Sequence, residues 1–168
     1  MKKKLCILLT LILVLTAVVA VTATACVTEL TAEELWAAAQ TPGTDADIHV
    51  TLKGSDGTVL YEYELKDGKV VTQTAAPGIT APDIANKLTG TGGLNFNAGY
   101  FSDTSIAADG ANSVYSANIT QPANFLGISD AVNGKLTIIA NRESGALVST
   151  TITYTTASGN SAAVTVVA

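Results

Sequence analysis

Three residues with metal-ligating side chains alternate near the start of a predicted strand: Asp45, Asp47 and His49. Alternation places them on one face of that strand. Residues two apart along a strand lie about 6.6–7 Å from each other, whereas zinc ligands must converge to about 2 Å from the ion. The spacing therefore favours a solvated strand face over a metal site, and we expect no metal or other cofactor.

Glu62 and Glu64 also share one strand face, at a spacing that overlaps the carboxylate pair of a glycosidase. Three lysines lie near enough in sequence to pair with them across a hairpin instead, namely Lys53, Lys66 and Lys69. The chain has a single histidine to serve as the base of a hydrolase triad. It has no Gly-x-Ser-x-Gly elbow, phosphate loop, dinucleotide fingerprint or EF-hand spacing. The sequence therefore predicts a protein that is not an enzyme.

The N-terminal segment has the pattern of an export signal. Three lysines follow Met1, and an uncharged run that is apolar apart from two threonines extends from Leu5 to Val21. Small residues at positions 22–25 then precede Cys26. We expect residues 1–25 to be a signal peptide. The apolar run is near the lower limit for a membrane span, so an uncleaved anchor is the alternative.

The stretch Ala23-Thr24-Ala25-Cys26 resembles the lipobox of bacterial lipoproteins, with Ala23 in place of the commoner Leu. The resemblance implies that the Cys26 thiol receives a diacylglyceryl group and that the chain is cleaved just before it. Residues 26–30 would then be the lipidated cysteine and a short tether. A lipid-anchored protein at the extracytoplasmic face of the cell membrane is the expectation. A plain signal peptide with a chance cysteine is the alternative.

The net charge of the chain indicates which classes of binding partner to expect. The formal net charge of −5 becomes −8 once Lys2, Lys3 and Lys4 leave with the signal. Such an acidic domain disfavours nucleic acid and an electrostatic contact with anionic lipid head groups. The membrane partner is therefore expected through the lipid on Cys26. Because Cys6 lies in the signal, no thiol remains for a disulfide.

Residues 31–168 are expected to form a single α+β domain. Thr31 and Glu34 form a capping box that begins a helix from Ala32 to Gln40, which Pro42-Gly43 ends. Period-two alternation and Gly-containing turns then predict strands. These strands cover residues 48–52, 59–66, 70–74, 113–120, 135–141, 147–156 and 162–167. In the strand at 147–156, Val148, Ile152 and Tyr154 are expected on one face, and the other face carries Ser149, Thr151, Thr153 and Thr155.

The alternation breaks between residues 75 and 112. A short helix through residues 82–88 and a mobile glycine-rich segment at 90–99 are expected there. Residues 121–125 read as a turn or one helical turn. The predicted fold is a curved antiparallel β-sheet with an N-terminal helix and short central helices packed on one face.

Aromatic residues occur in every predicted element. They form either a filled core or the lining of an apolar pocket in a concave sheet, with the glycine-rich segment as its lid. If they line a pocket, the candidate ligand-binding residues are Trp36, Tyr61, Tyr63, Phe96, Phe101 and Tyr154.

The order of elements resembles the lipoprotein-carrier-like group, which includes the LolA and LprG types. A lipobox cysteine, a helix, a meander and helical interruptions lead to a final meander with a turn at Asn141 to Ser149. The resemblance covers most of the mature chain and carries over one functional residue, Cys26. It implies a curved sheet over helices with an apolar cavity. The main hypothesis is therefore non-catalytic binding or carriage of an apolar, acyl-chain-like ligand. The alternative is a structural or adhesive surface domain without a small-molecule ligand.

Overall fold

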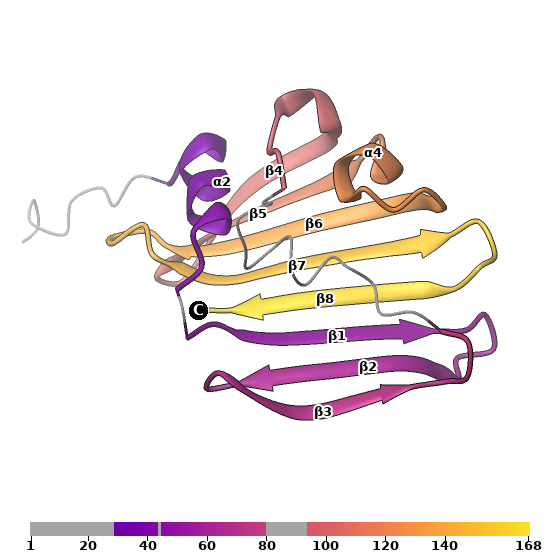
Figure 1. Ribbon diagram of the computed structural model, residues 1–168. Coiled ribbons are helices and arrows are strands. Elements are labelled where there is room, and N and C mark those ends of the chain that lie inside the picture. The colour runs from indigo at the N-terminus through magenta and orange to yellow at the C-terminus, as the bar shows by residue number, and fades with distance from the viewer. Residues whose placement is uncertain (1–28, 44, 80–93) are drawn as a thin grey trace, which may run out of the picture.

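The main feature of the fold is one eight-stranded sheet, in the order β3-β2-β1-β8-β7-β6-β5-β4. The computed structural model describes residues 29–43, 45–79 and 94–168 (Figure 1). The strands are β1 (Asp47–Lys53), β2 (Val59–Lys66), β3 (Lys69–Ala75), β4 (Phe101–Asp109), β5 (Asn112–Ile119), β6 (Ala131–Asn141), β7 (Leu147–Thr156) and β8 (Ser161–Val167). All neighbouring strands are antiparallel, which confirms the predicted antiparallel sheet.

Two meanders join to make this sheet. One contains β1 to β3 and the other β4 to β8, and within each the strands follow chain order. Short turns join successive strands, except that a short helix lies between β5 and β6. The first and last strands then pair with each other, from Asp47 opposite Val167 to Lys53 opposite Ser161. The sheet remains open, with β3 and β4 at its two edges.

The first helix, α2 (Ala32–Gln40), has the predicted bounds and the predicted cap. The Thr31 hydroxyl accepts a hydrogen bond from the Glu34 backbone N–H at 3.3 Å. The Glu34 carboxylate accepts one from the Thr31 backbone N–H at 2.8 Å. The same carboxylate also accepts a hydrogen bond from the Thr31 hydroxyl at 3.0 Å. The two bonds to the carboxylate favour its ionised form and lower the pKa of Glu34. Leu35 and Ala39 are buried, and the helix contacts β6 and β7.

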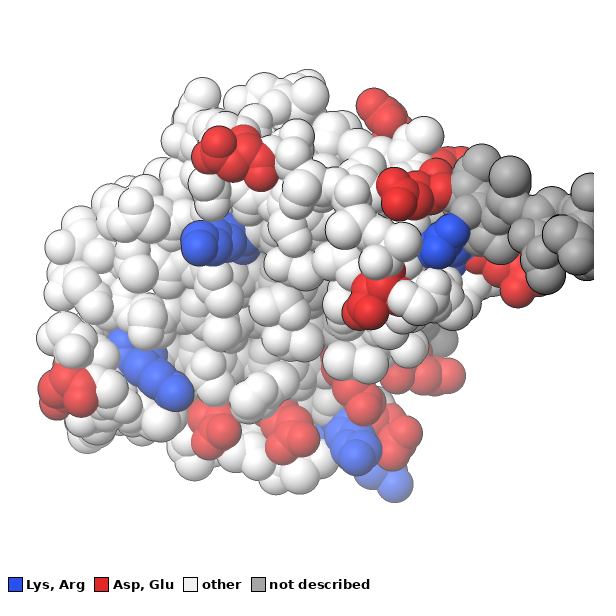
Figure 2. Space-filling model, turned by 180° about the vertical axis from the view of Figure 1, so that it is seen from behind, with Lys and Arg blue, Asp and Glu red and all other residues white. Residues whose placement is uncertain are grey.

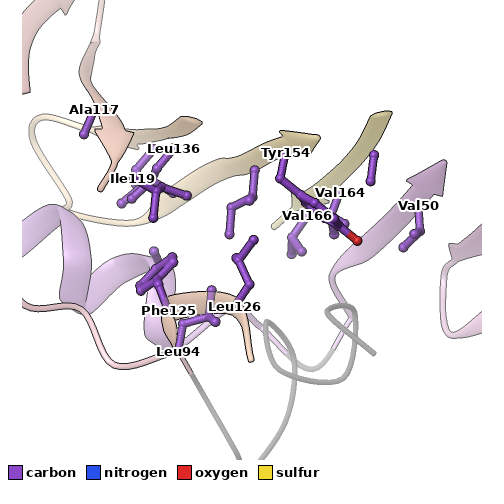
Figure 3. Close-up of a cluster of buried hydrophobic side chains, with 14 of the residues drawn as sticks. Val50, Leu94, Ala117, Ile119, Phe125, Leu126, Leu136, Tyr154, Val164 and Val166 are labelled. Carbon is purple, nitrogen blue, oxygen red and sulfur yellow. The ribbon is translucent and has the colours of Figure 1, made fainter. Parts of the chain in front are cut away.

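A second, short helix follows β5. This helix, α4 (Pro122–Leu126), begins with proline in its first turn and is followed by Gly127 at φ 67°. Its Phe125 and Leu126 are buried and lie toward Ile119 and Leu136 of the sheet (Figure 3). The predicted helical turn at residues 121–125 is confirmed. The predicted helix at 82–88 and residues 90–93 of the glycine-rich segment lie outside the described residues.

Strand β4 corrects the sequence analysis, which predicted no strand between residues 75 and 112. This strand lies at the sheet edge, and most of its side chains are exposed. Its pairing with β5 is also interrupted between Ser102 and Ser105, where Asp103 has φ 50°. Because the edge strand has little to bury and its register shifts, its sequence lacks the period-two pattern.

The predicted direction of Val148 was wrong. Ile139 lies opposite Ser149 and Ala140 lies opposite Leu147, so Val148 is an extra residue in the β6–β7 ladder. It is exposed, whereas Thr150 is buried on the same face as Ile152 and Tyr154. A bulge of this kind cannot be read from alternation, because the threonine and valine side chains both suit a strand.

The two faces of the sheet differ in chemistry. One face carries the apolar core, including Val50, Leu136, Ile152 and Val164, which are at most 1% exposed. The opposite, outer face is rich in hydroxyl groups. Across its middle, Thr165 lies opposite His49 and Thr151, and Thr151 lies opposite Thr137. Figure 2 shows that few charged side chains lie over the middle of this outer face.

Candidate ligand-binding groove

The residues first considered for metal binding have other partners. Asp45 precedes β1, so it does not share the strand with Asp47 and His49. The Asp47 carboxylate accepts a hydrogen bond from the Asp67 backbone N–H at 3.0 Å. His49 Nε2 lies 3.4 Å from Glu62 Oε1, so the carboxylate predicted to pair with lysine contacts histidine. Over residues 29–43, 45–79 and 94–168, no group of three acidic, His or Cys side chains is arranged to hold a metal.

Six aromatic rings form one cluster at the β4 end of the molecule. Phe101, the first residue of β4, lies at its centre. Its ring centroid is 5.6 Å from that of Trp36 in α2, 6.1 Å from that of Tyr115 in β5, and 5.2 Å from that of Phe125 in α4. Phe96 contacts both Phe101 and Phe125, and Tyr100 contacts Phe125. The cluster therefore links both helices to the sheet.

The structure brings together only three of the six predicted ligand-binding residues, Trp36, Phe96 and Phe101. Tyr61 and Tyr154 lie three strands apart in the sheet order, or about 14 Å. Neither they nor Tyr63 take part in the aromatic contacts described above. Tyr61 and Tyr154 are core residues, 6% and 4% exposed, and Tyr63 is half-buried.

Burial also changes the ionisation of the two core tyrosines. It raises the pKa of Tyr154 to about 12, with a further contribution from the negative charge of Asp130. It raises the pKa of Tyr61 as well, with a smaller contribution from Tyr63. Both phenols are therefore held in the neutral form. Cys26 lies outside the described residues.

A groove of about 510 Å³ opens beside the aromatic cluster, between α2 and the β4–β5 edge. Trp36, Phe101, Tyr115 and Ile106 provide its apolar lining, and Glu33 of α2 also borders it. The remaining lining residues are Ala32, Ala98, Thr104 and Ser105. Its size and its mainly apolar lining with a few polar groups are typical of small-molecule sites.

Two polar atoms of residues that line the groove are themselves shielded from solvent. They are Trp36 Nε1 and the Tyr115 hydroxyl oxygen. The side chains meet edge to face, with ring centroids 5.9 Å apart. Burial raises the pKa of Tyr115, and the nearby indole N–H of Trp36 lowers it by a smaller amount. The indole N–H of Trp36 therefore lies close enough to the Tyr115 hydroxyl to interact with it.

Sequence reasoning missed Tyr115 and Ile106 as groove residues. Tyr115 lies on the buried face of β5, opposite Ile106 of β4. Its alternation with Val114 and Ser116 marked a strand but did not distinguish core from groove. Ile106 lies in the strand that the sequence analysis did not predict. To predict that Tyr115 and Ile106 line one groove, it would be necessary to know that β4 and β5 are neighbours.

A second hollow, of about 770 Å³, lies on the sheet near the start of β6. Its lining combines polar side chains, among them Asn118, Lys135 and Thr153, with apolar ones. These three polar side chains come from positions on the outer face, so this hollow lies at a different place from the aromatic groove.

Comparisons with protein families, curated proteins and solved structures found no match to this chain. Within the part of the chain that the structure describes, no helix combines the length and apolar character needed to cross a membrane.

Proposed function

We propose that this protein is an exported, lipid-anchored protein that binds an apolar, acyl-chain-like ligand without catalysis. The observation that carries the proposal is the groove between α2 and β4, with Trp36, Phe101, Tyr115 and Ile106 in its lining. A ligand entering this groove would lose contact with water, at a gain of about 0.8 kcal/mol for each buried methylene.

The location proposed for the protein is the extracytoplasmic face of the cell membrane. The lipobox resemblance at Cys26 supports this location, as does the capped helix that begins only a few residues later. A lipid on Cys26 would hold the groove, which α2 borders, close to the membrane that contains acyl chains. We also propose that short central helices, together with α2, cover one face of the sheet.

Lipid attachment is tested with the full chain and a Cys26→Ser variant, produced in a bacterium that processes lipoproteins. The full chain should fractionate with membranes and carry the mass of a diacylglyceryl group. The variant should lose that added mass. A full chain without the added mass would contradict the lipid anchor, and membrane retention of the variant would support an uncleaved anchor instead.

Ligand binding is tested by native mass spectrometry of the detergent-solubilised full chain. A small molecule that leaves on activation would support the binding function and show its chemical class. Ala98→Phe should reduce occupancy, because Ala98 lines the groove. Ala107→Phe is the matched control, since Ala107 is exposed on the nearby edge strand β4 and does not line the groove. Equal occupancy in the two variants would contradict binding in the groove.

The outer sheet face favours a second function, that of a structural or adhesive surface domain. Its hydroxyl-rich middle and its broad hollow provide a surface for contact with another envelope component. Thr153→Glu would place a charge in that hollow. The test is whether isolated cell wall retains the full chain. Retention that Thr153→Glu abolishes and that the control Thr74→Glu, on edge strand β3, leaves unchanged would support this function over ligand binding.

A further inference from the structure

The hollow on the outer face of the sheet has a charge opposite to that of the chain as a whole. The chain contains 14 acidic and 9 basic residues. The lining of the hollow nevertheless includes Lys53 and Lys135 and, among the described residues, no aspartate or glutamate. Figure 2 shows acidic side chains mainly around the margin of this face. An anion that enters the hollow therefore meets a favourable local charge.

Both lysines are available to a ligand. Their side chains are exposed, and neither forms an ion pair or a side-chain hydrogen bond with another described residue. Asn118, which lies opposite Lys135 in the sheet, donates a hydrogen bond from Nδ2 to the Asp103 carboxylate at 2.8 Å. A bound anion would therefore replace no ion pair within the described part of the chain.

Hydroxyl groups lie between the two lysines. Thr153 and Thr155 of β7 and Ser161 of β8 line the hollow, and Ser161 lies opposite Thr155. Thr155 Oγ1 accepts a hydrogen bond from Asn133 Nδ2 at 3.0 Å, so the hydrogen of this hydroxyl remains free to donate. Hydroxyl groups can donate to the oxygens of an anion and can also accept from the hydroxyls of a polyol.

The separation of the two lysines indicates the size of the ligand. Lys53 in β1 and Lys135 in β6 are three strands apart in the sheet order, or about 14 Å. They are also offset by two residues along the strands, which brings the separation of their backbones to about 16 Å. A polymer with charges along its length meets both ammonium groups without requiring both flexible side chains to fold inward.

The lining also bears on the kind of polymer. Among the described lining residues, Tyr154 is the only aromatic one, and it is 4% exposed. Single-stranded nucleic acids bind largely through bases that stack on aromatic rings. The hollow therefore favours a charged polymer of polyol or sugar units over a nucleic acid.

The position of the hollow distinguishes such a polymer from a lipid surface. Near the start of the described chain, the Leu30 backbone N–H donates to Ser113 Oγ at 3.1 Å, at the beginning of β5. Asn118 and Lys135 lie instead at the end of β5 and near the start of β6. Figure 1 shows α2 at the left ends of the strands and the start of β6 at the right. A lipid on Cys26 would therefore leave the hollow facing away from the membrane.

We propose that the hollow binds an anionic polymer of the cell envelope, built of polyol or sugar units joined by phosphate groups. Lys53 and Lys135 contact separate phosphates, and the hydroxyls between them donate to the intervening oxygens. The site is separate from the aromatic groove, and only its location in the envelope rests on the proposed function. The inference gives a chemical identity to the partner of the outer face.

The test measures the affinity of the full chain in detergent for poly(glycerol phosphate). Lys53→Gln and Lys135→Gln should each weaken binding about fivefold, because one lysine at an anionic surface corresponds to about that factor. Added salt should weaken binding as well. Lys69→Gln is the matched control, since it makes the same change of charge on edge strand β3, outside the hollow.

The contribution of the hydroxyl groups is tested with Thr153→Val, which keeps the branched shape of the side chain. It should weaken binding about threefold, the size of one modest net hydrogen bond. Thr74→Val, on β3 and outside the hollow, should have no effect. Dextran, an uncharged sugar polymer, should bind at least about tenfold more weakly than poly(glycerol phosphate), because it has no charge for the lysines to contact.

Each contrary result has a distinct meaning. Equal losses in Lys135→Gln and Lys69→Gln would indicate a general charge effect and overturn the site. Dextran binding as tight as that of the charged polymer would overturn anion recognition, and no binding of poly(glycerol phosphate) would overturn the whole inference. Tighter binding to phosphatidylglycerol micelles than to the polymer would assign the hollow to a lipid surface instead. None of these results depends on acyl binding or on Cys26, so a failure of the proposed function is recognised separately.

Discussion

Individual side chains in this protein often have a role that their type alone does not reveal. Tyr61 and Tyr154 have the amphipathic character of ligand-binding residues, yet the structure places them in the core. Tyr115 has the same chemistry and is buried as well, yet it also borders the groove. The difference arises from the neighbouring strands and helices, which either surround a ring or leave a groove beside it.

Tyr154 should make stability depend on alkaline pH. Its pKa is raised to about 12, so the folded state holds its proton more tightly than the unfolded state does. This contribution is fully present below pH 10 and is lost as the pH rises toward 12. Over that range the original protein should lose about 2–3 kcal/mol of unfolding free energy more than Tyr154→Phe does. Urea unfolding of both proteins at several pH values measures the difference, and parallel pH curves would contradict it.

Gly134 should be intolerant of a side chain. A Cβ atom at this position would lie 2.9 Å from Ile119 Cδ1 and 3.0 Å from Ile119 Cβ. Gly134→Ala should therefore lower the unfolding free energy by about 1–3 kcal/mol. Ile119→Val removes Cδ1, so the double variant should recover part of that loss. Gly43→Ala has open space around its Cβ position and should not destabilise. Chemical denaturation compares these four variants with the original protein, and additive effects in the double variant would contradict the proposed clash.

Among the elements, α2 is stabilised mainly by its N-terminal cap and by its buried side. Thr31→Ala removes the hydroxyl that accepts from the Glu34 backbone N–H, and should cost about 1 kcal/mol of stability. Glu34→Gln should remove a pH-dependent contribution as well. The pKa of Glu34 is lowered from 4.5, so its contribution is present above that pH and is lost as the pH falls through the lowered value.

Glu33→Gln is the control for this effect, because Glu33 also lies in the first turn of α2 but makes no cap hydrogen bond. Thermal unfolding between pH 7 and pH 3 compares the variants. The difference between the original protein and Glu34→Gln should shrink toward acid pH. A difference that is constant with pH would show that the carboxylate does not act through the cap.

Strand β3 is the element most exposed to association with other chains. It forms one edge of the sheet, and its Val70 and Val71 are 54% and 59% exposed. Exposed apolar edge strands pair with other strands, and a lysine on the edge opposes this. Val71→Lys should therefore raise the concentration at which light scattering detects association. Val132→Lys, on a strand inside the sheet, should not change it. Equal effects of the two lysines would indicate a general charge effect instead.

At the scale of the whole molecule, the β1–β8 ladder makes one sheet from two meanders. The sheet should therefore unfold in one step. Val164, in β8, is fully buried, and Val164→Ala should cost about 2 kcal/mol. Val167→Ala, on the same strand but 44% exposed, should cost less than about 0.5 kcal/mol.

Two signals test this cooperativity during urea unfolding. Trp36 fluorescence reports on the α2–β4 corner, and far-ultraviolet circular dichroism reports on the whole sheet. Val164→Ala should shift both midpoints by the same amount. A shift in circular dichroism with no shift in fluorescence would mean that the two meanders unfold separately.

The local features of this fold could be predicted because they depend on residues close together in the chain. The Thr31–Glu34 cap sets the start of α2, and the Asp67-Gly68 turn sets the end of β2. Period-two alternation located every strand except β4. These signals act over a few residues, so they can be read without knowing the neighbours.

Only the tertiary structure decided the features that require distant segments to meet. The β1–β8 pairing, the bulge at Val148 and the β4 edge depend on which strands become neighbours. The groove depends on α2 lying beside β4 and β5, which brings Trp36 to Tyr115 across 79 positions of sequence. Period-two alternation indicates which side chains are buried, but not which elements pack against them. Core and groove therefore differ through packing between distant elements, which the residue pattern does not record.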